Sequence, residues 1–164
     1  MPNIFTSPEK GEFDGPAIFL AGPIQGAPDW QVEAVALLVG EPDLAVFNPR
    51  RREFIVEGPD KAAQWDWEHA HLDRAGKRGC IMFWLCREAN HDCRRAYAQC
   101  TRFELGEAMM RHVRDGVRVV VGIDEGFTNG GYLRHTLAKK APGIPLAVTL
   151  EETVRLAAEA ARRP

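Results

Sequence analysis

Short, continuous apolar runs alternate along the chain with segments whose apolar residues recur every three or four positions. The continuous runs predict buried strands at residues 17–21, 44–47, 80–85, 117–123 and 145–148. Apolar residues at helical spacing predict helices at residues 28–39, 61–75, 104–114, 132–140 and 150–162. The apolar face of the first helix is expected to carry Val32, Val35, Ala36 and Val39. Residues 1–16 are mostly polar, contain Pro and Gly, and are expected to form an irregular N-terminal arm.

The alternation of strands and helices predicts a single α/β domain over residues 17–164. Parallel strands need long crossover connections, so we expect a doubly wound, mostly parallel five-stranded sheet of the flavodoxin or Rossmann kind. Such sheets bind ligands beyond the carboxyl ends of their strands. Gly22, Asn48, Trp84 and Asp124 lie at those ends, which places the predicted site along one edge of the sheet.

The composition is that of an ordinary globular protein. Of the 164 residues, 45% are hydrophobic, which is enough to bury one core. The formal net charge is −2, so no strongly basic surface favours nucleic acid or an anionic membrane. No apolar run approaches the ~20 residues that cross a bilayer, and the start of the chain lacks a secretory signal. We therefore expect a cytoplasmic protein.

Four cysteines lie in one short stretch of the chain, at Cys80, Cys86, Cys93 and Cys100. Five or six residues separate consecutive cysteines, whereas zinc sites typically use pairs separated by two. We therefore expect reduced, unpaired thiols and no bound metal.

Glu104 is the leading candidate for a chemical role. The segment Arg102–Ala108 is predicted to enter a helix with Glu104 in its first turn, where the helix dipole favours the ionised carboxylate. Gly106 would allow a ligand or another chain to approach closely. An ionised carboxylate in a cleft can attack a sugar carbon. The alternative is that Glu104 only stabilises the start of its helix.

A second carboxylate lies in the segment Gln64–Glu68. Trp65 and Glu68 are three residues apart and can share one helix face, while Trp67 points elsewhere. A carboxylate that faces inward is costly unless it has a task. The alternative is a surface helix with buried tryptophans.

Two further motifs follow predicted strands. Gly22–Pro23 ends the first strand, and its glycine lets backbone amides approach a ligand; it matches neither a dinucleotide fingerprint nor a phosphate loop. Phe83–Trp84 ends the third strand, where an aromatic ring can stack on a planar base or simply complete the core.

Taken together, these motifs resemble nucleoside 2-deoxyribosyltransferases and their relatives over about residues 17–158. The resemblance rests on Phe19–Pro23, Trp67–Glu68 with Leu72, Phe83–Trp84, Phe103–Gly106, Tyr132–Leu133 and Gly143–Pro145. It implies that Glu104 attacks the anomeric carbon and that Glu68 handles the proton of the departing base.

The resemblance also implies the rest of the reaction. A glycosyl ester of Glu104 would pass 2-deoxyribose from a nucleoside to a free nucleobase, with retention and without a metal or other cofactor. Asn129 would be donated by a neighbouring subunit, so a homo-oligomer with shared sites is expected. The expected substrate-binding residues are Phe19, Gly22, Pro23, Asn48, Asp66, Trp84 and Asn129.

The chain departs from the family at three places that bear on substrate recognition. One is the loop from Arg87 to Gln99, which is basic and contains cysteine where the family version is usually rich in proline. Ala98 stands where many members have an aspartate, and Arg50–Arg52 follow the second strand where relatives often have an acid. One alternative is therefore a nucleoside or nucleotide N-glycohydrolase in which one of these arginines clamps a phosphate. A second is a non-catalytic nucleotide-binding domain, which Ala98 favours and the retained Glu104 and Glu68 oppose.

Overall fold

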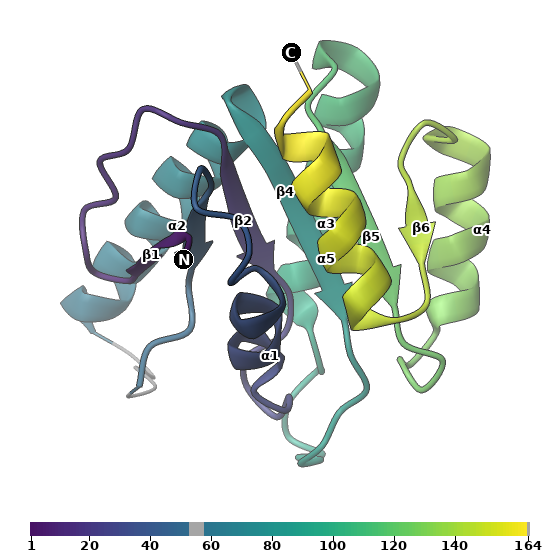
Figure 1. The fold of residues 1–164 in the computed structure, drawn as a ribbon. Helices are drawn as coiled ribbons and strands as arrows, with labels where there is room; N and C mark the ends of the chain where they lie inside the picture. Colours follow the sequence, from purple (N-terminus) through teal and green to yellow (C-terminus); the bar gives the residue numbers. More distant parts are fainter. Residues whose placement is uncertain (53–57, 164) are drawn as a thin grey trace.

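The computed structural model describes residues 1–52 and 58–163 and has the α/β architecture that the sequence predicts (Figure 1). Its parallel sheet has the strand order β1-β3-β2-β4-β5-β6. The strands are β1 (Asn3–Thr6), β2 (Ala17–Ala21), β3 (Ala45–Asn48), β4 (Gly79–Leu85), β5 (Val119–Ile123) and β6 (Leu146–Ala147). The helices are α1 (Trp30–Leu37), α2 (Pro59–Lys77), α3 (Gln99–Asp115), α4 (Gly130–Lys140) and α5 (Leu150–Ala161).

Strand β1 corrects two predictions. Residues 1–16 were expected to be irregular and the sheet to have five strands, but β1 adds a sixth strand at the sheet edge. It pairs in parallel with β3, from Asn3 opposite Ala45 to Thr6 opposite Asn48. Only four residues long and incompletely buried, β1 lacks the apolar run that marks an interior strand.

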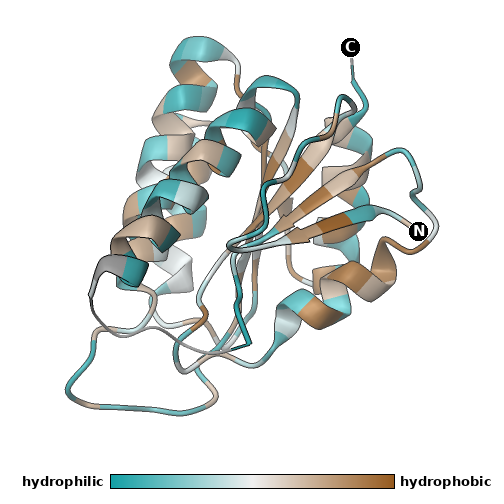
Figure 2. Ribbon diagram, turned by 90° about the vertical axis from the view of Figure 1, so that its left-hand side faces the viewer, coloured by the Kyte–Doolittle hydropathy of each residue, from teal (hydrophilic) through white to brown (hydrophobic). Residues whose placement is uncertain are grey.

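Two helical layers cover the sheet. Helices α1 and α5 lie on one face, and α2, α3 and α4 lie on the other (Figures 1 and 2). Neighbouring residues of a strand face opposite layers, so on β2 Phe19 packs toward α2 and α3 while Ile18 packs toward α1 and α5. The strands therefore carry many of the most hydrophobic residues, whereas hydrophilic residues are frequent on the helices of the α2 and α3 layer (Figure 2).

Helix α1 packs mainly through a different face from the one predicted, although the predicted Val35 is partly buried against the core. It buries Trp30, Ala34 and, just beyond its end, Leu38, whereas Val32 and Val39 are exposed. Both sets follow helical spacing, and the set that contains the large Trp30 ring faces the sheet.

The topology provides an opening beside β2. After β3 the chain crosses back and continues with β4 on the other side of β2. The direction in which successive strands are added to the sheet therefore reverses between β2 and β4, while all strands stay parallel. Connections leave such a switch point in opposite directions and expose a crevice at the carboxyl ends of the strands.

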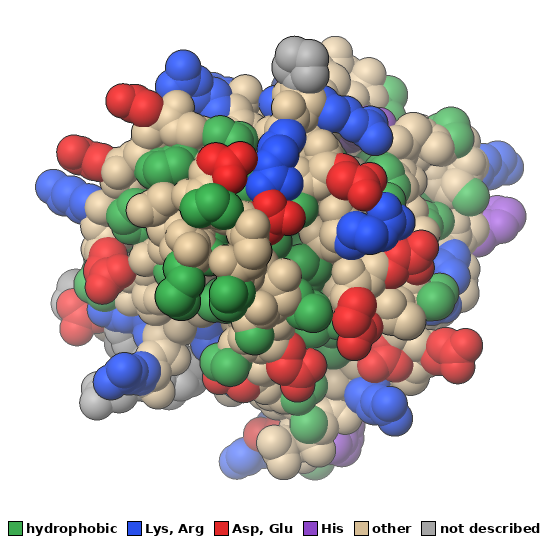
Figure 3. Space-filling model, in the orientation of Figure 1, with side chains coloured by type: hydrophobic (Ala, Val, Ile, Leu, Met, Phe, Trp, Pro, Cys, Tyr) green, Lys and Arg blue, Asp and Glu red, His purple; other side chains and the backbone are tan. Residues whose placement is uncertain are grey.

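Charged residues of both signs are interspersed over the face shown in Figure 3. In the described ranges, no helix is both long and apolar enough to span a membrane.

Candidate active site

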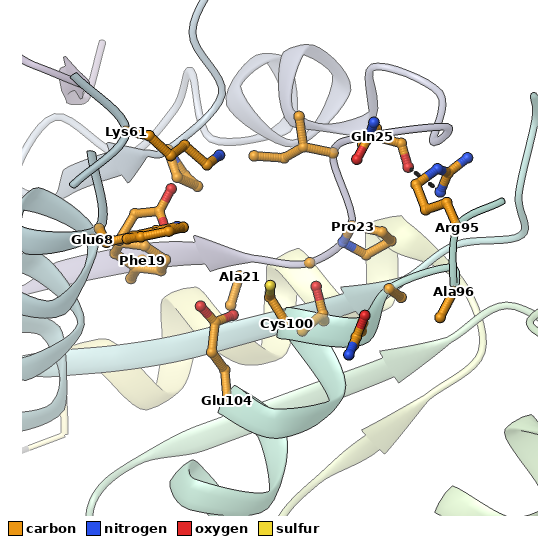
Figure 4. Close-up of a pocket in the computed structure, with 17 residues that line it drawn as sticks. Phe19, Ala21, Pro23, Gln25, Lys61, Glu68, Arg95, Ala96, Cys100 and Glu104 are labelled. Carbon is orange, nitrogen blue, oxygen red and sulfur yellow. Dashed lines mark hydrogen bonds between the residues drawn. The ribbon is translucent and has the colours of Figure 1, made fainter. Parts of the chain in front are cut away.

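A pocket opens at the carboxyl end of β2, between α2 and the start of α3 (Figure 4). Glu68 and Lys61 lie at one end of the pocket, Gln25 and Arg95 lie at the other, and Glu104 points in from α3 (Figure 4). The lining residues are Phe19, Ala21, Gly22, Pro23, Ile24, Gln25, Pro49, Lys61, Trp65, Glu68, Arg95, Ala96, Ala98, Gln99, Cys100, Thr101 and Glu104. The two carboxylates predicted from the sequence therefore lie in one pocket although they come from different helices.

Glu104 enters the pocket from the second turn of α3. The helix begins at Gln99, earlier than predicted, and its first turn contains no acidic residue. The predicted stabilisation of ionised Glu104 by a first-turn position was therefore wrong. Burial raises the pKa of Glu104 from 4.5 to about 7, and the negative charges of Glu68 and Glu107 add to this effect.

Glu68 faces the pocket from α2, as predicted. Burial raises the pKa of Glu68, while a hydrogen bond from Gln64 and the positive charge of Lys61 act in the opposite direction. Trp65 lines the same pocket, whereas the Trp67 ring packs in the core. This confirms the helical-face prediction for Trp65, Trp67 and Glu68.

The turn after β2 forms the pocket wall opposite α3. Its Gly22 is required by packing, since an added Cβ would lie 2.5 Å from the backbone oxygen of Trp84 and 2.6 Å from Cζ2 of Trp30. The Trp30 Nε1–H donates to the backbone oxygen of Pro23 at 3.0 Å. Trp30 therefore stabilises the turn, and Phe19, on β2 just before the turn, also lines the pocket.

A family model described as "Nucleoside 2-deoxyribosyltransferase like" matches residues 15–127 of this chain. The matched region contains β2, both carboxylates and the whole pocket lining. The chain belongs to the nucleoside 2-deoxyribosyltransferase-like family. A search among curated proteins found no match.

Not all of the residues predicted for this nucleoside 2-deoxyribosyltransferase-like site line the pocket. Asn48 uses its side-chain oxygen to accept a hydrogen bond from the Arg50 backbone at 2.9 Å, and its neighbour Pro49 lines the pocket instead. Asp66 is exposed on α2. Asn129 is exposed at the start of α4, in a left-handed backbone conformation with φ 61°.

Trp84 lies on the other side of the sheet from the carboxylate pair. Phe83 and Trp84 are neighbours on β4, so only one of them can face the α2 and α3 layer, and that residue is Phe83. The Trp84 ring packs over Gly122, where an added Cβ would lie 2.5 Å from its Cε3 atom. A base in the pocket would therefore not stack on Trp84; the aromatic rings that line the pocket are those of Phe19 and Trp65.

The sequence did not predict that Arg95 lines the pocket. Arg95 Nη1–H donates to the backbone oxygen of Gln25 at 3.0 Å, and Nη2 bonds Glu88 Oε1 at 2.9 Å and the backbone oxygen of Asn90 at 3.1 Å. The Asn90 N–H donates to the Gly26 oxygen at 3.0 Å. These bonds fasten the loop before α3 to the turn after β2. Arginine in a basic, polar loop has the sequence signature of a solvated residue, so no pattern distinguishes it.

The four cysteines are free thiols. Cys80 and Cys86 are buried and Cys93 and Cys100 are exposed, with Cys100 on the pocket wall. Within residues 1–52 and 58–163, no group of three or more His, Cys, Asp or Glu side chains is arranged to hold a metal ion.

Proposed function

We propose that this protein transfers 2-deoxyribose between nucleobases through a covalent glycosyl ester of Glu104. One observation carries the proposal: two largely buried carboxyl groups, Glu104 and Glu68, come from separate helices to one pocket, and both have raised pKa values. Ionising both members of a buried carboxyl pair costs free energy, and carboxyl groups held under such conditions are typical of functional sites. The family membership supports the same chemistry.

The pair has the groups that the reaction needs. Because burial and, to a smaller extent, the negative charge of Glu68 raise the pKa of Glu104, the pair retains a proton closer to neutral pH than exposed carboxylates do. Glu104 has the pKa that burial raises to about 7, so at rest it holds the proton of the pair for much of the time. In the productive form that proton lies on Glu68 and Glu104 is ionised. Glu104 attacks the anomeric carbon, the carbon–nitrogen bond breaks, and the proton of Glu68 passes to the departing base.

The second half of the reaction reverses these roles. An incoming base attacks the anomeric carbon of the ester, the carbon–oxygen bond to Glu104 breaks, and Glu68 takes the proton that the new base loses. Each attack inverts the anomeric centre, so the product has the starting configuration. The rings of Phe19 and Trp65 supply apolar surface on which a planar base can stack.

A nucleotide N-glycohydrolase is the second candidate, and it is favoured by the cations of the pocket. Arg50, one of the three arginines considered as a phosphate clamp, donates to the backbone oxygen of Pro28 at 2.9 Å and to Gln31 Oε1 at 3.1 Å. Lys61 and Arg95 line the pocket and supply positive charge there. Arg95 is paired with Glu88 Oε1 at 2.9 Å, so it would have to share its guanidinium between Glu88 and a 5′-phosphate on the substrate.

Product analysis with deoxynucleosides separates the two candidates. The protein is incubated with a deoxynucleoside, with and without a different free base, and in parallel with the corresponding 5′-monophosphate. A transferase produces the new nucleoside only when the acceptor is present; a nucleotide hydrolase releases base from the monophosphate with or without it. Glu104→Ala is the control and should abolish both products. If the protein forms neither product from any of the common bases, the proposal is wrong.

A further inference from the structure

The buried Gln64 side chain connects the N-terminal strand to the Glu68 carboxylate. Gln64 is 5% exposed, and its amide makes three hydrogen bonds. Nε2 donates to Glu68 Oε1 at 2.6 Å and to the backbone oxygen of Pro49 at 2.9 Å. Oε1 accepts a hydrogen bond from Ser7 Oγ at 2.5 Å. The amide is therefore bonded to three separate parts of the chain.

These partners fix the direction of the Gln64 amide. A reversed amide would turn its oxygen toward the Pro49 carbonyl and the Glu68 carboxylate, neither of which can donate while Glu68 is ionised. The Ser7 hydroxyl rotates to donate to the oxygen in the observed direction. The amide nitrogen is thus held against Glu68 Oε1 and leaves the second oxygen of Glu68 for the substrate.

Strand β1 fixes the position of Ser7. Thr6 is paired with Asn48 in the parallel register, and the Ser7 N–H donates to the backbone oxygen of Asn48 at 3.3 Å. Ser7 itself is 5% exposed. It precedes the region that the family model matches, residues 15–127, whereas Gln64 and Glu68 lie within it. The connection therefore begins in a part of this chain that the family motifs do not include.

We propose that Ser7 and Gln64 form a relay of hydrogen bonds that positions Glu68 and directs its proton to the oxygen that faces the substrate. The inference rests on the proposed role of Glu68 as the proton donor. Ser7 and Gln64 are positioning residues, because they act through Glu68 and neither is among the residues that line the pocket. The relay makes the edge strand part of the catalytic apparatus.

The relay also affects the proton affinity of Glu68. A hydrogen bond donated to a carboxylate favours its ionised form, so the Gln64 bond lowers the pKa of Glu68 against the larger effect of burial. The other charged or titratable groups that act on Glu68 are Lys61 and His69 on α2 and Glu104 on α3. Removal of the Gln64 amide leaves these three groups in place, so the resulting change in the pKa of Glu68 reports the effect of the Gln64 hydrogen bond alone.

The test follows the titration of Glu68 by carboxyl-carbon NMR in protein labelled at glutamate, with the signal assigned from Glu68→Gln. In Gln64→Met the side-chain length is kept and the donor is lost, so the pKa of Glu68 should rise by about half a pH unit or more. Ser7→Ala should shift it less and in the same direction, and Ser7→Thr, which keeps the hydroxyl, should restore most of the original value. Gln31→Met is the matched control, because Gln31 is also fully buried but lies on α1, outside the pocket lining.

An unchanged Glu68 titration in Gln64→Met, or an equal shift in Gln31→Met, would overturn the relay. If Gln64→Met does not fold, the Ser7→Ala and Ser7→Thr pair decides in its place. Activity gives a second readout: kcat in Gln64→Met should fall at least about tenfold for a poor leaving base, with little change in KM. If the unmodified protein transfers no sugar, the proposed function fails, while the titration still decides the relay.

Discussion

Glu68 on α2 and Glu104 on α3 line the same pocket, and the negative charge of Glu68 adds to burial in raising the pKa of Glu104 to about 7. Neither helix alone creates this pair. The switch in strand order beside β2 leaves room for both side chains at the carboxyl end of one strand. Their mutual influence provides a route to one ionised and one protonated carboxyl group near neutral pH.

Removal of the Glu68 proton should affect substrates unequally. In Glu68→Gln, a base that leaves poorly loses its proton donor, and its transfer should slow by about 10²-fold or more, whereas an activated base that leaves without protonation should be affected far less. The measurement is kcat/KM for a series of bases of different leaving ability. Asp66→Asn is the matched control, because Asp66 is on the same helix but exposed. Equal losses over the whole series would make Glu68 a binding residue.

Glu104 should reduce stability at high pH. The pKa of Glu104 is raised in the folded protein, so the folded state holds this proton more tightly than the unfolded chain does. The free energy of unfolding should therefore fall as pH rises from about 4.5 through 7. That difference corresponds to roughly 3 kcal/mol. Glu104→Gln should therefore be more stable than the parent at pH 8 and about equal to it at pH 4. Denaturant unfolding of both proteins at pH 4 and pH 8 checks this. Equal stability at pH 8 would show that ionised Glu104 does not destabilise the folded protein.

Two glycines should respond to alanine in opposite ways. Gly22→Ala places a Cβ 2.5 Å from the Trp84 backbone oxygen, so it should destabilise the fold by ~1–3 kcal/mol and disturb the pocket wall. Gly106→Ala lies within α3, and apart from the helix's own neighbouring backbone no atom lies within 4 Å of the new Cβ, so it should stabilise the helix by ~1 kcal/mol. Chemical denaturation of both variants measures this. A destabilising Gly106→Ala would indicate that a second chain packs against that glycine.

Assembly remains a prediction, and Asn129 provides its test. The side chain is exposed and does not line the pocket of its own chain, so a role in catalysis requires a neighbouring subunit. Asn129→Gly removes the side chain and keeps the left-handed backbone. In a dimer with shared sites, randomly mixed Glu104→Ala and Asn129→Gly subunits should recover activity in about a quarter of the sites. No recovery after confirmed subunit exchange, or a monomeric protein, would leave Asn129 without this role.

Much of the fold and the carboxylate pair could be predicted because both follow from local patterns. Continuous apolar runs identified the five strands β2 to β6, and the three-residue spacing of Trp65 and Glu68 placed these two side chains on one helix face. The exact start of α3 could not be predicted. Ala98, at its N-cap, has a left-handed backbone with φ 56° and gives no capping signal, so the helix begins earlier than the pattern around Glu104 indicated.

The remaining errors concern contacts that no local pattern encodes. Strand β1 forms because β3 offers a free edge, and its four residues have no apolar alternation of their own. Trp84 and Phe83 are equally plausible at the strand end, and only the direction of the strand decides which faces the pocket. Arg95 and Gln64 act through partners far away in the chain, at Gln25 and Ser7. Such residues can be identified only after the chain has folded.

The most direct test of the account looks for the glycosyl–enzyme ester itself. The protein is mixed with a deoxynucleoside in the absence of an acceptor base, quenched in acid, digested and examined by mass spectrometry. A deoxyribosyl adduct should appear on the peptide that contains Glu104, should be absent from Glu104→Gln, and should disappear when a free base is added before the quench. An adduct on Glu68 or any other residue would contradict the account. So would a Glu104→Gln protein that keeps more than about a tenth of the transfer rate.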